Sequence, residues 1–138
     1  MFGTSVAQFG ALYHTRNSIS NSLYKTLMIV CAIEVVAAFV SVFAFWSFVV
    51  VEVHSAFGLV LIVTILENIH YKKTKSQLSL FMIYGVGMAV VAVLCHVFKL
   101  AFSVWFNHAD LSHIFMAISM YLMYKGASKY QSPSIKLV

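Results

Sequence analysis

The sequence predicts an all-α integral membrane protein, built as an antiparallel bundle of four membrane-spanning helices with both termini on the cytoplasmic side. The first observation behind this prediction is composition: of 138 residues, 62% are hydrophobic and only 9% are charged, far outside the range of soluble domains. The second is that the apolar residues form runs of about 20 or more, the length that a helix needs to cross the hydrocarbon. The third is that the basic residues lie between those runs.

Each part of the chain follows from these runs. The first residues are mixed in character and rich in Ser, Thr and Asn, so we expect a poorly ordered arm, with a surface-lying amphipathic segment as the alternative. The apolar stretch 25–71 is long enough for two spans, and Trp46 marks the turn because aromatic residues favour the membrane interface. The expected parts are an N-terminal cytoplasmic arm (1–24), a bundle (25–125) with spans at about 25–46, 49–71, 79–99 and 108–124, and a C-terminal cytoplasmic tail (126–138).

Charge orients this bundle. All nine basic residues except Lys99 fall on one side of the four expected spans. By the positive-inside rule, both termini and the middle loop 72–75 face the cytoplasm or its equivalent. We therefore expect a multi-pass protein of a bacterial plasma membrane or the mitochondrial inner membrane. The basic residues form no face interleaved with aromatic residues, which excludes nucleic acid as a partner.

The predicted topology brings three histidines to one level. His54, His96 and His113 each lie three to five residues inside the outer end of a different expected span, which is about 5–8 Å below the boundary. His108 and Asp110 lie just above them. Asp110 and His113 share a helical face, so Asp110 is expected to orient the His113 ring, while His108 points elsewhere and lies at the rim.

Such a layer suits a cofactor. Three neutral imidazoles between apolar walls are a plausible ligand set for zinc, iron or copper, and pairs of them could instead clamp haem b. Each histidine could equally form a hydrogen bond to a neighbouring helix. His54 and Gly58 share a face, which would let another helix or a flat cofactor approach closely.

The remaining polar residues lie away from this layer. Glu34 falls near mid-membrane, where a lone carboxylate is expensive; it is either a buried proton site, in a relay or a quinone pocket, or a protonated acid that forms hydrogen bonds within the bundle. We expect His70 at the interface and His14 in solvent. No GxSxG, HExxH or CxxC motif is present, and no serine has an evident His/Asp partner in sequence.

Two short stretches resemble known families. Residues 106–113, Phe-Asn-His-Ala-Asp-Leu-Ser-His, with the apolar helix that follows, resemble the last-helix signature of membrane proteins distantly similar to the superfamily of alkaline ceramidases and adiponectin-receptor-like proteins. That resemblance implies a metal-dependent lipid hydrolase, although the superfamily has seven spans and an HxxxH pair where this chain has HxxxxH. Residues 54–58, His-Ser-Ala-Phe-Gly, are similar to the HxxxG element of small membrane cytochromes b, which implies haem b.

Three function hypotheses follow. The leading one is a small membrane subunit of a redox or electron-transfer assembly. It holds a transition metal ion (Zn, Fe or Cu) or haem b through His54, His96 and His113, and Asp110 forms a hydrogen bond to a ligand histidine. The second is a structural accessory subunit without a cofactor, and the third is a metal-dependent membrane lipid hydrolase. In each case the expected partners are the lipid bilayer and either other membrane subunits or further copies of the chain.

Overall fold

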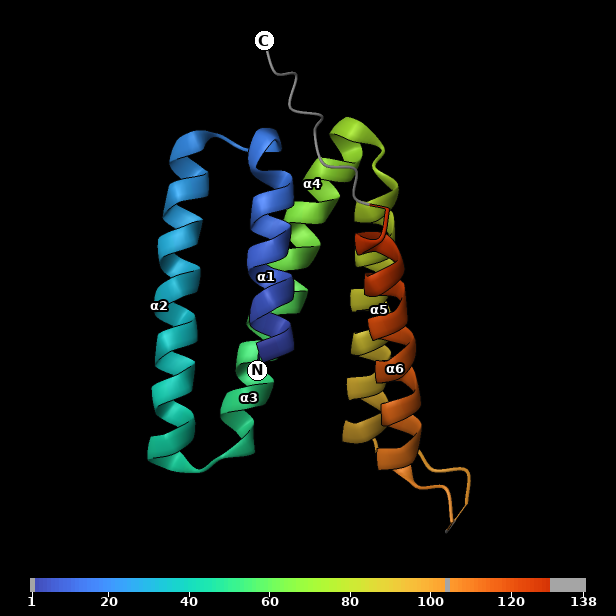
Figure 1. Ribbon diagram of the computed structural model, residues 1–138. Helices are drawn as coiled ribbons and strands as arrows, with labels where there is room; N and C mark the ends of the chain where they lie inside the picture. Colours follow the sequence, from blue (N-terminus) through green and yellow to red (C-terminus); the bar gives the residue numbers. More distant parts are fainter. Residues whose placement is uncertain (1, 104, 130–138) are drawn as a thin grey trace. The chain divides into compact units, whose positions relative to one another are not determined.

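The computed structural model describes residues 2–103 and 105–129, and these residues form helices and no named strand (Figure 1). The chain divides into two compact units, Met1–Lys75 (the N-terminal unit) and Ser76–Val138 (the C-terminal unit), and each is described here by itself. The all-helical class predicted from the sequence is confirmed for the described residues.

The N-terminal unit consists of three long helical segments. They are α1 (Phe2–Thr15), α2 (Asn21–Phe45) and a continuous helix made of α3 (Phe48–Ser55), the π-helical segment η2 (Ala56–Val63) and α4 (Thr64–Thr74). Helix α1 lies between α2 and the continuous helix (Figure 1). Where the sequence suggested a poorly ordered arm, the structure has a helix whose Gln8, Ala11, Leu12 and Thr15 are buried.

The ends of α2 are set by local chemistry. The Ser20 side chain caps the start by accepting a hydrogen bond from the Leu23 N–H (3.2 Å). At the other end Trp46 adopts a left-handed conformation (φ 48°), and its N–H closes the helix on the Val42 carbonyl (3.0 Å). The chain therefore turns at Trp46, whose side chain is 86% exposed.

Close packing in the N-terminal unit centres on two features. Leu12, Cys31, Ile62 and Leu66 form a buried apolar cluster that joins α1, α2 and the continuous helix. Gly58 faces α1 so closely that an added Cβ would lie 2.9 Å from Thr4 Cγ2. The close helix approach that the sequence predicted at Gly58 is thus confirmed, and α1 is the helix that makes it.

The C-terminal unit is a helical hairpin of α5 (Gln77–Val97) and α6 (His108–Ala127). Small residues allow the two helices to meet: Gly85 lies against Ser119 and Met123 of α6, and the Ser119 hydroxyl donates to the Gly85 carbonyl (2.6 Å). Packing through small residues and interhelical hydrogen bonds is typical of helix pairs in membranes.

Three helices of the described residues are long and apolar enough to cross a membrane: Asn21–Phe45, Val49–Thr74 and Gln77–Val97. On α2, the large apolar side chains of Ile33, Val36 and Phe43 are mostly exposed, as expected of a surface that faces lipid. The chain is therefore a membrane protein.

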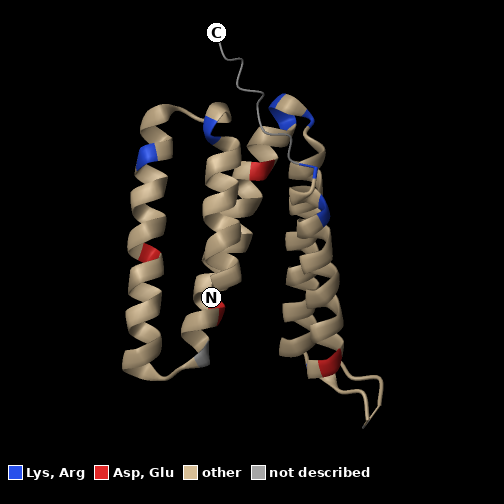
Figure 2. Ribbon diagram, in the orientation of Figure 1, with Lys and Arg blue, Asp and Glu red and all other residues tan. Residues whose placement is uncertain are grey.

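Helix α6 covers the fourth predicted span but is not one of these three apolar helices. Its first two turns carry the polar side chains of His108, Asp110 and His113. Figure 2 shows that the Lys and Arg residues of the N-terminal unit lie at one end of its helices. At this end the chain passes from α1 to α2, and α4 ends there too. The four-span bundle and the side on which the termini lie stay predictions.

Candidate acid-base site in the N-terminal unit

His54 is the centre of a buried polar site. Its side chain is 0% exposed, in α3. Its Nδ1 lies 2.8 Å from Oε1 of Glu34 on α2, and its Nε2 lies 3.2 Å from the hydroxyl of Ser5 on α1. Because a carboxylate oxygen only accepts, Nδ1 carries a proton and donates it to Glu34. In the neutral ring, Nε2 then accepts the Ser5 hydroxyl proton.

The approach of α1 at Gly58 positions Ser5. A side chain at Gly58 would collide with Thr4 and Gln8, so the absence of one is what lets the first turn of α1 reach His54. The Thr4 hydroxyl lies 3.3 Å from that of Ser55, which adds a second polar contact at this level. The π-helical segment η2 begins immediately after Ser55, and π segments inside α-helices occur frequently at functional sites.

Three buried polar atoms beside this site have no hydrogen-bond partner in the described part of the chain: Nε2 and Oε1 of Gln8, and Oε2 of Glu34. Gln8 follows Ser5 by three residues and so lies on the same face of α1. The nearby Cys31 thiol interacts with Gln8, but a thiol is a weak partner. Leaving a buried polar group unpaired costs about 1–3 kcal/mol, so these atoms mark a place where water or a polar ligand group binds favourably.

A second polar cluster joins the last turn of α1 to α4. Nδ1 of His14 lies 3.2 Å from both carboxylate oxygens of Glu67, whose side chain is 0% exposed. The rings of His14 and His70 lie 4.4 Å apart, and His70 Nδ1 lies 2.6 Å from the Ser18 hydroxyl. The expectation that His14 lies in solvent is wrong, because its side chain is only 13% exposed and is held by Glu67.

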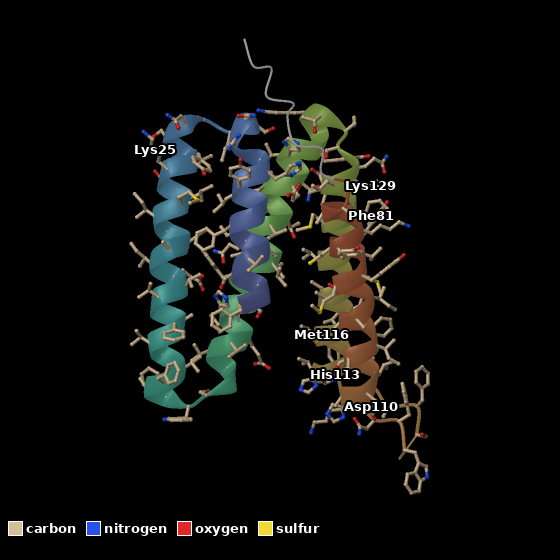
Figure 3. The ribbon with its side chains drawn as sticks, in the orientation of Figure 1. Lys25, Phe81, Asp110, His113, Met116 and Lys129 are labelled. Carbon is tan, nitrogen blue, oxygen red and sulfur yellow. The ribbon has the colours of Figure 1, made fainter. Side chains whose placement is uncertain are left out.

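The remaining predicted site residues lie in the C-terminal unit. The rings of His96, at the end of α5, and His108, at the start of α6, are 5.2 Å apart. Asp110 accepts from the Asn107 N–H (3.1 Å) as half of a capping box, and His113 donates from Nδ1 to the Ala109 carbonyl (2.6 Å). Asp110 thus serves the helix end, and Nδ1 of His113 is engaged by its own helix. Figure 3 shows Asp110 and His113 on successive turns of α6.

The predicted cofactor layer joins His54 of one unit with His96 and His113 of the other, and it stays a prediction. Among residues 2–103 and 105–129, no group of three or more His, Cys, Asp or Glu side chains is placed to hold a metal ion. Both nitrogens of His54 are engaged within its own unit, so a metal could bind this ring only by displacing Ser5 or Glu34.

Sequence reasoning missed Ser5 and Gln8 because it treated the first 24 residues as an arm. One signal could have found Gln8: Thr4, Gln8, Ala11 and Thr15 recur at steps of three and four, which puts polar and small side chains on one helical face, and Ser5, three residues before Gln8, borders that face. This face is the one that packs against η2 and α4.

Comparison with known proteins gives a family but no function. No curated protein and no solved structure matches the chain. A family model described as a family of unknown function, DUF6962, matches residues 1–132. Since this match covers nearly the whole sequence, the chain belongs to the DUF6962 family.

Proposed function

We propose that this membrane protein uses His54 as an intramembrane acid-base group that binds and releases a proton, with Glu34 as its charge partner. The observation that carries the proposal is the bonded series Glu34–His54–Ser5 around a fully buried imidazole. Ionisable groups inside membrane segments are expensive to keep, and they commonly mark proton relays. Glu34 lowers the cost of an imidazolium at this position by supplying the opposite charge at hydrogen-bond distance.

The unpartnered atoms favour this role over a purely structural one. Anchoring a histidine requires only one oxygen of a carboxylate. The other oxygen of Glu34, Oε2, is buried without a hydrogen-bond partner in the described part of the chain, and so are Nε2 and Oε1 of Gln8. Ordered water is the usual partner of such atoms. Water held by Glu34 and Gln8 would supply and remove the proton that His54 exchanges.

The second cluster supplies a matching acid-base group elsewhere in the same unit. His54 and Glu67 are thirteen residues apart along one helix, which at the rise of an α-helix is roughly 20 Å. The buried cluster of Leu12, Cys31, Ile62 and Leu66 includes Ile62, which lies between His54 and Glu67 along this helix. This arrangement, with two acid-base groups on one helix and buried apolar side chains between them, suits stepwise transfer of protons.

Proton flux into vesicles tests the proposal. The purified protein is placed in vesicles that enclose a pH-sensitive dye, and a pH step is applied outside. We expect faster internal acidification than in empty vesicles, and a return to the empty-vesicle rate with His54→Gln or Glu34→Gln. His96→Gln, at an exposed position of the other unit, is the matched control and should keep the wild-type rate.

Infrared or nitrogen NMR titration of His54 gives an independent readout. A His54 ring that holds one protonation state from about pH 4 to 9, together with no flux above empty vesicles, would refute the proposal. The control variant also reports on the C-terminal unit, since a loss of flux with His96→Gln would move the proton site away from His54.

The contact between His96 and His108 favours a second candidate, the metal or haem site of a redox subunit. Ring centroids 5.2 Å apart allow two imidazoles to share one ion. Metal analysis and an absorption spectrum of purified protein test this candidate. We expect one Zn, Fe or Cu ion, or a haem Soret band, that is lost in His96→Ala and His108→Ala; protein free of both refutes it.

A further inference from the structure

We infer that Ser5 is a nucleophile for acyl transfer, with His54 as its general base, Glu34 as the group that orients the imidazole and Gln8 as the donor to the oxyanion. The inference rests on the proposed acid-base role of His54 and names a substrate class for it, carboxylic esters of lipids. It gives the N-terminal unit an activity that its family description does not assign.

The direction of each hydrogen bond supports this assignment. Glu34 binds Nδ1 of His54 (2.8 Å), so the lone pair of the neutral ring is on Nε2, and Nε2 faces the Ser5 hydroxyl (3.2 Å). Acid on Nδ1 and serine on Nε2 is the order in which a carboxylate, an imidazole and a serine act in acyl transfer. Both distances are within the reach expected of a nucleophile and its base.

Gln8 supplies the remaining component. It lies three residues after Ser5, on the same face of α1, and apart from the weak contact with the Cys31 thiol its buried Nε2 has no acceptor in the described part of the chain. Side-chain amides are among the donors that stabilise the oxyanion of a tetrahedral intermediate. An unpaired donor one helical turn from the nucleophile is therefore placed to bind negative charge that forms beside Ser5.

The exposure of Ser5 fits a lipid substrate that reaches it from the bilayer, and the contacts of Thr4 explain why Ser5 and not its neighbour is the nucleophile. Ser5 is partly exposed whereas His54 is buried, so a substrate can reach the hydroxyl while the base stays shielded from water. The neighbouring hydroxyl, that of Thr4, contacts Ser55 and not the imidazole. Thr4 is therefore an internal control, a hydroxyl at the same level that lacks the base.

The chemistry balances without a further cofactor. Ser5 Oγ bonds to the ester carbonyl carbon as its proton moves to His54 Nε2, and the oxyanion accepts from Gln8 Nε2. The bond from carbon to the alcohol oxygen then breaks, and the alcohol leaves with the proton from His54. Water next attacks the acyl-serine, gives a proton to His54, and the acid is released as Ser5 regains its proton. The net reaction is ester plus water giving acid plus alcohol.

Labelling with an alkyl fluorophosphonate tests the inference on the full-length protein in detergent micelles. Serine attack on phosphorus expels fluoride and leaves a covalent mark, which peptide mass spectrometry locates. We expect one mark on Ser5, none in Ser5→Ala, and a wild-type rate in Thr4→Val. His54→Gln should slow labelling by about 100-fold or more, the contribution typical of a positioned general base.

The outcomes separate this inference from the proposed function. Absence of a mark on wild-type Ser5 refutes the nucleophile, and the proton-exchange proposal still stands if His54 titrates. A mark on Ser5 that forms equally fast in His54→Gln refutes His54 as the general base of Ser5, whereas the proton-exchange proposal is decided separately by the flux and the titration of His54. Since the site of labelling is read on the wild-type protein, the test does not depend on whether any variant folds.

Discussion

Gly58→Ala should separate α1 from His54. The added Cβ would lie 2.9 Å from Thr4 Cγ2 and 3.0 Å from Gln8 Oε1, whereas ordinary contacts begin near 3.4 Å. Gln8 can turn its flexible end away, but Thr4 Cγ2 is held close to the α1 backbone. Relief of that contact requires α1 to move by roughly 0.5 Å, the gap between 2.9 Å and ordinary contact.

That movement is enough to break the site. The Ser5 hydroxyl is already 3.2 Å from His54 Nε2, and a shift of this size along the contact direction carries it beyond 3.5 Å, where a hydrogen bond is lost. We expect fluorophosphonate labelling of Ser5 to fall at least tenfold. Overpacking costs about 1–3 kcal/mol and the Gly-to-Ala gain in a helix returns about 1 kcal/mol, so stability should fall by roughly 0–2 kcal/mol.

Gly10→Ala is the matched control. Gly10 also lies in the N-terminal unit, within α1, and an added Cβ there has no atom within 4 Å. This variant should melt at or above the wild-type temperature and keep the wild-type labelling rate. If Gly58→Ala behaved in the same way as Gly10→Ala in both assays, the argument that Gly58 positions Ser5 would be refuted.

Three further variants and one control variant test individual contacts by thermal denaturation in detergent. Asn107→Ala removes the capping box of α6 and should cost about 0.5–2 kcal/mol, with faster amide exchange in the first turn; unchanged exchange there would contradict the cap. Lys75→Gly relieves a left-handed residue (φ 54°) and should stabilise by about 1 kcal/mol, whereas Lys72→Gly, inside α4, should destabilise by a similar amount; equal effects would contradict the strain. Ser119→Ala removes the hydrogen bond to the Gly85 carbonyl and should cost about 0.5–1.5 kcal/mol, so a neutral result would show that the bond contributes nothing.

The membrane helices could be predicted from the sequence because each long apolar run indicates its own helix. A run of about 20 apolar residues such as 25–46 marks a helix whatever its neighbours are, since no other spanning structure satisfies its backbone within one segment. The close approach at Gly58 could be predicted for a related reason, because a glycine on a polar helical face offers its backbone to any partner.

The site is harder to predict, because α1 has no long apolar run and only the weaker spacing of its small and polar residues indicates a packed helix. The polar side chains of Thr4, Ser5, Gln8 and His14 are typical of a weakly structured segment. The helix is stable because these side chains meet complementary polar groups of α3 and α4. Helix formation here depends on tertiary partners more than on intrinsic propensity. The pairing of Ser5 with His54, 49 residues away, is a property of that packing.

Two variants at Glu67 decide whether the second cluster anchors α1 or also carries protons. Glu67→Ala removes the carboxylate that His14 contacts, and a hydrogen bond to a charged group is worth about 1.5–3 kcal/mol, so hydrogen exchange of the α1 amides should speed up by roughly 10- to 150-fold relative to α2. Glu67→Gln keeps an acceptor for His14 and removes only the charge, so α1 should stay docked. If Glu67→Gln then lowers proton flux while exchange in α1 stays near wild type, Glu67 takes part in transfer. If flux is unchanged in Glu67→Gln, the cluster is an anchor, and the route to His54 must pass through Gln8 and Glu34 alone.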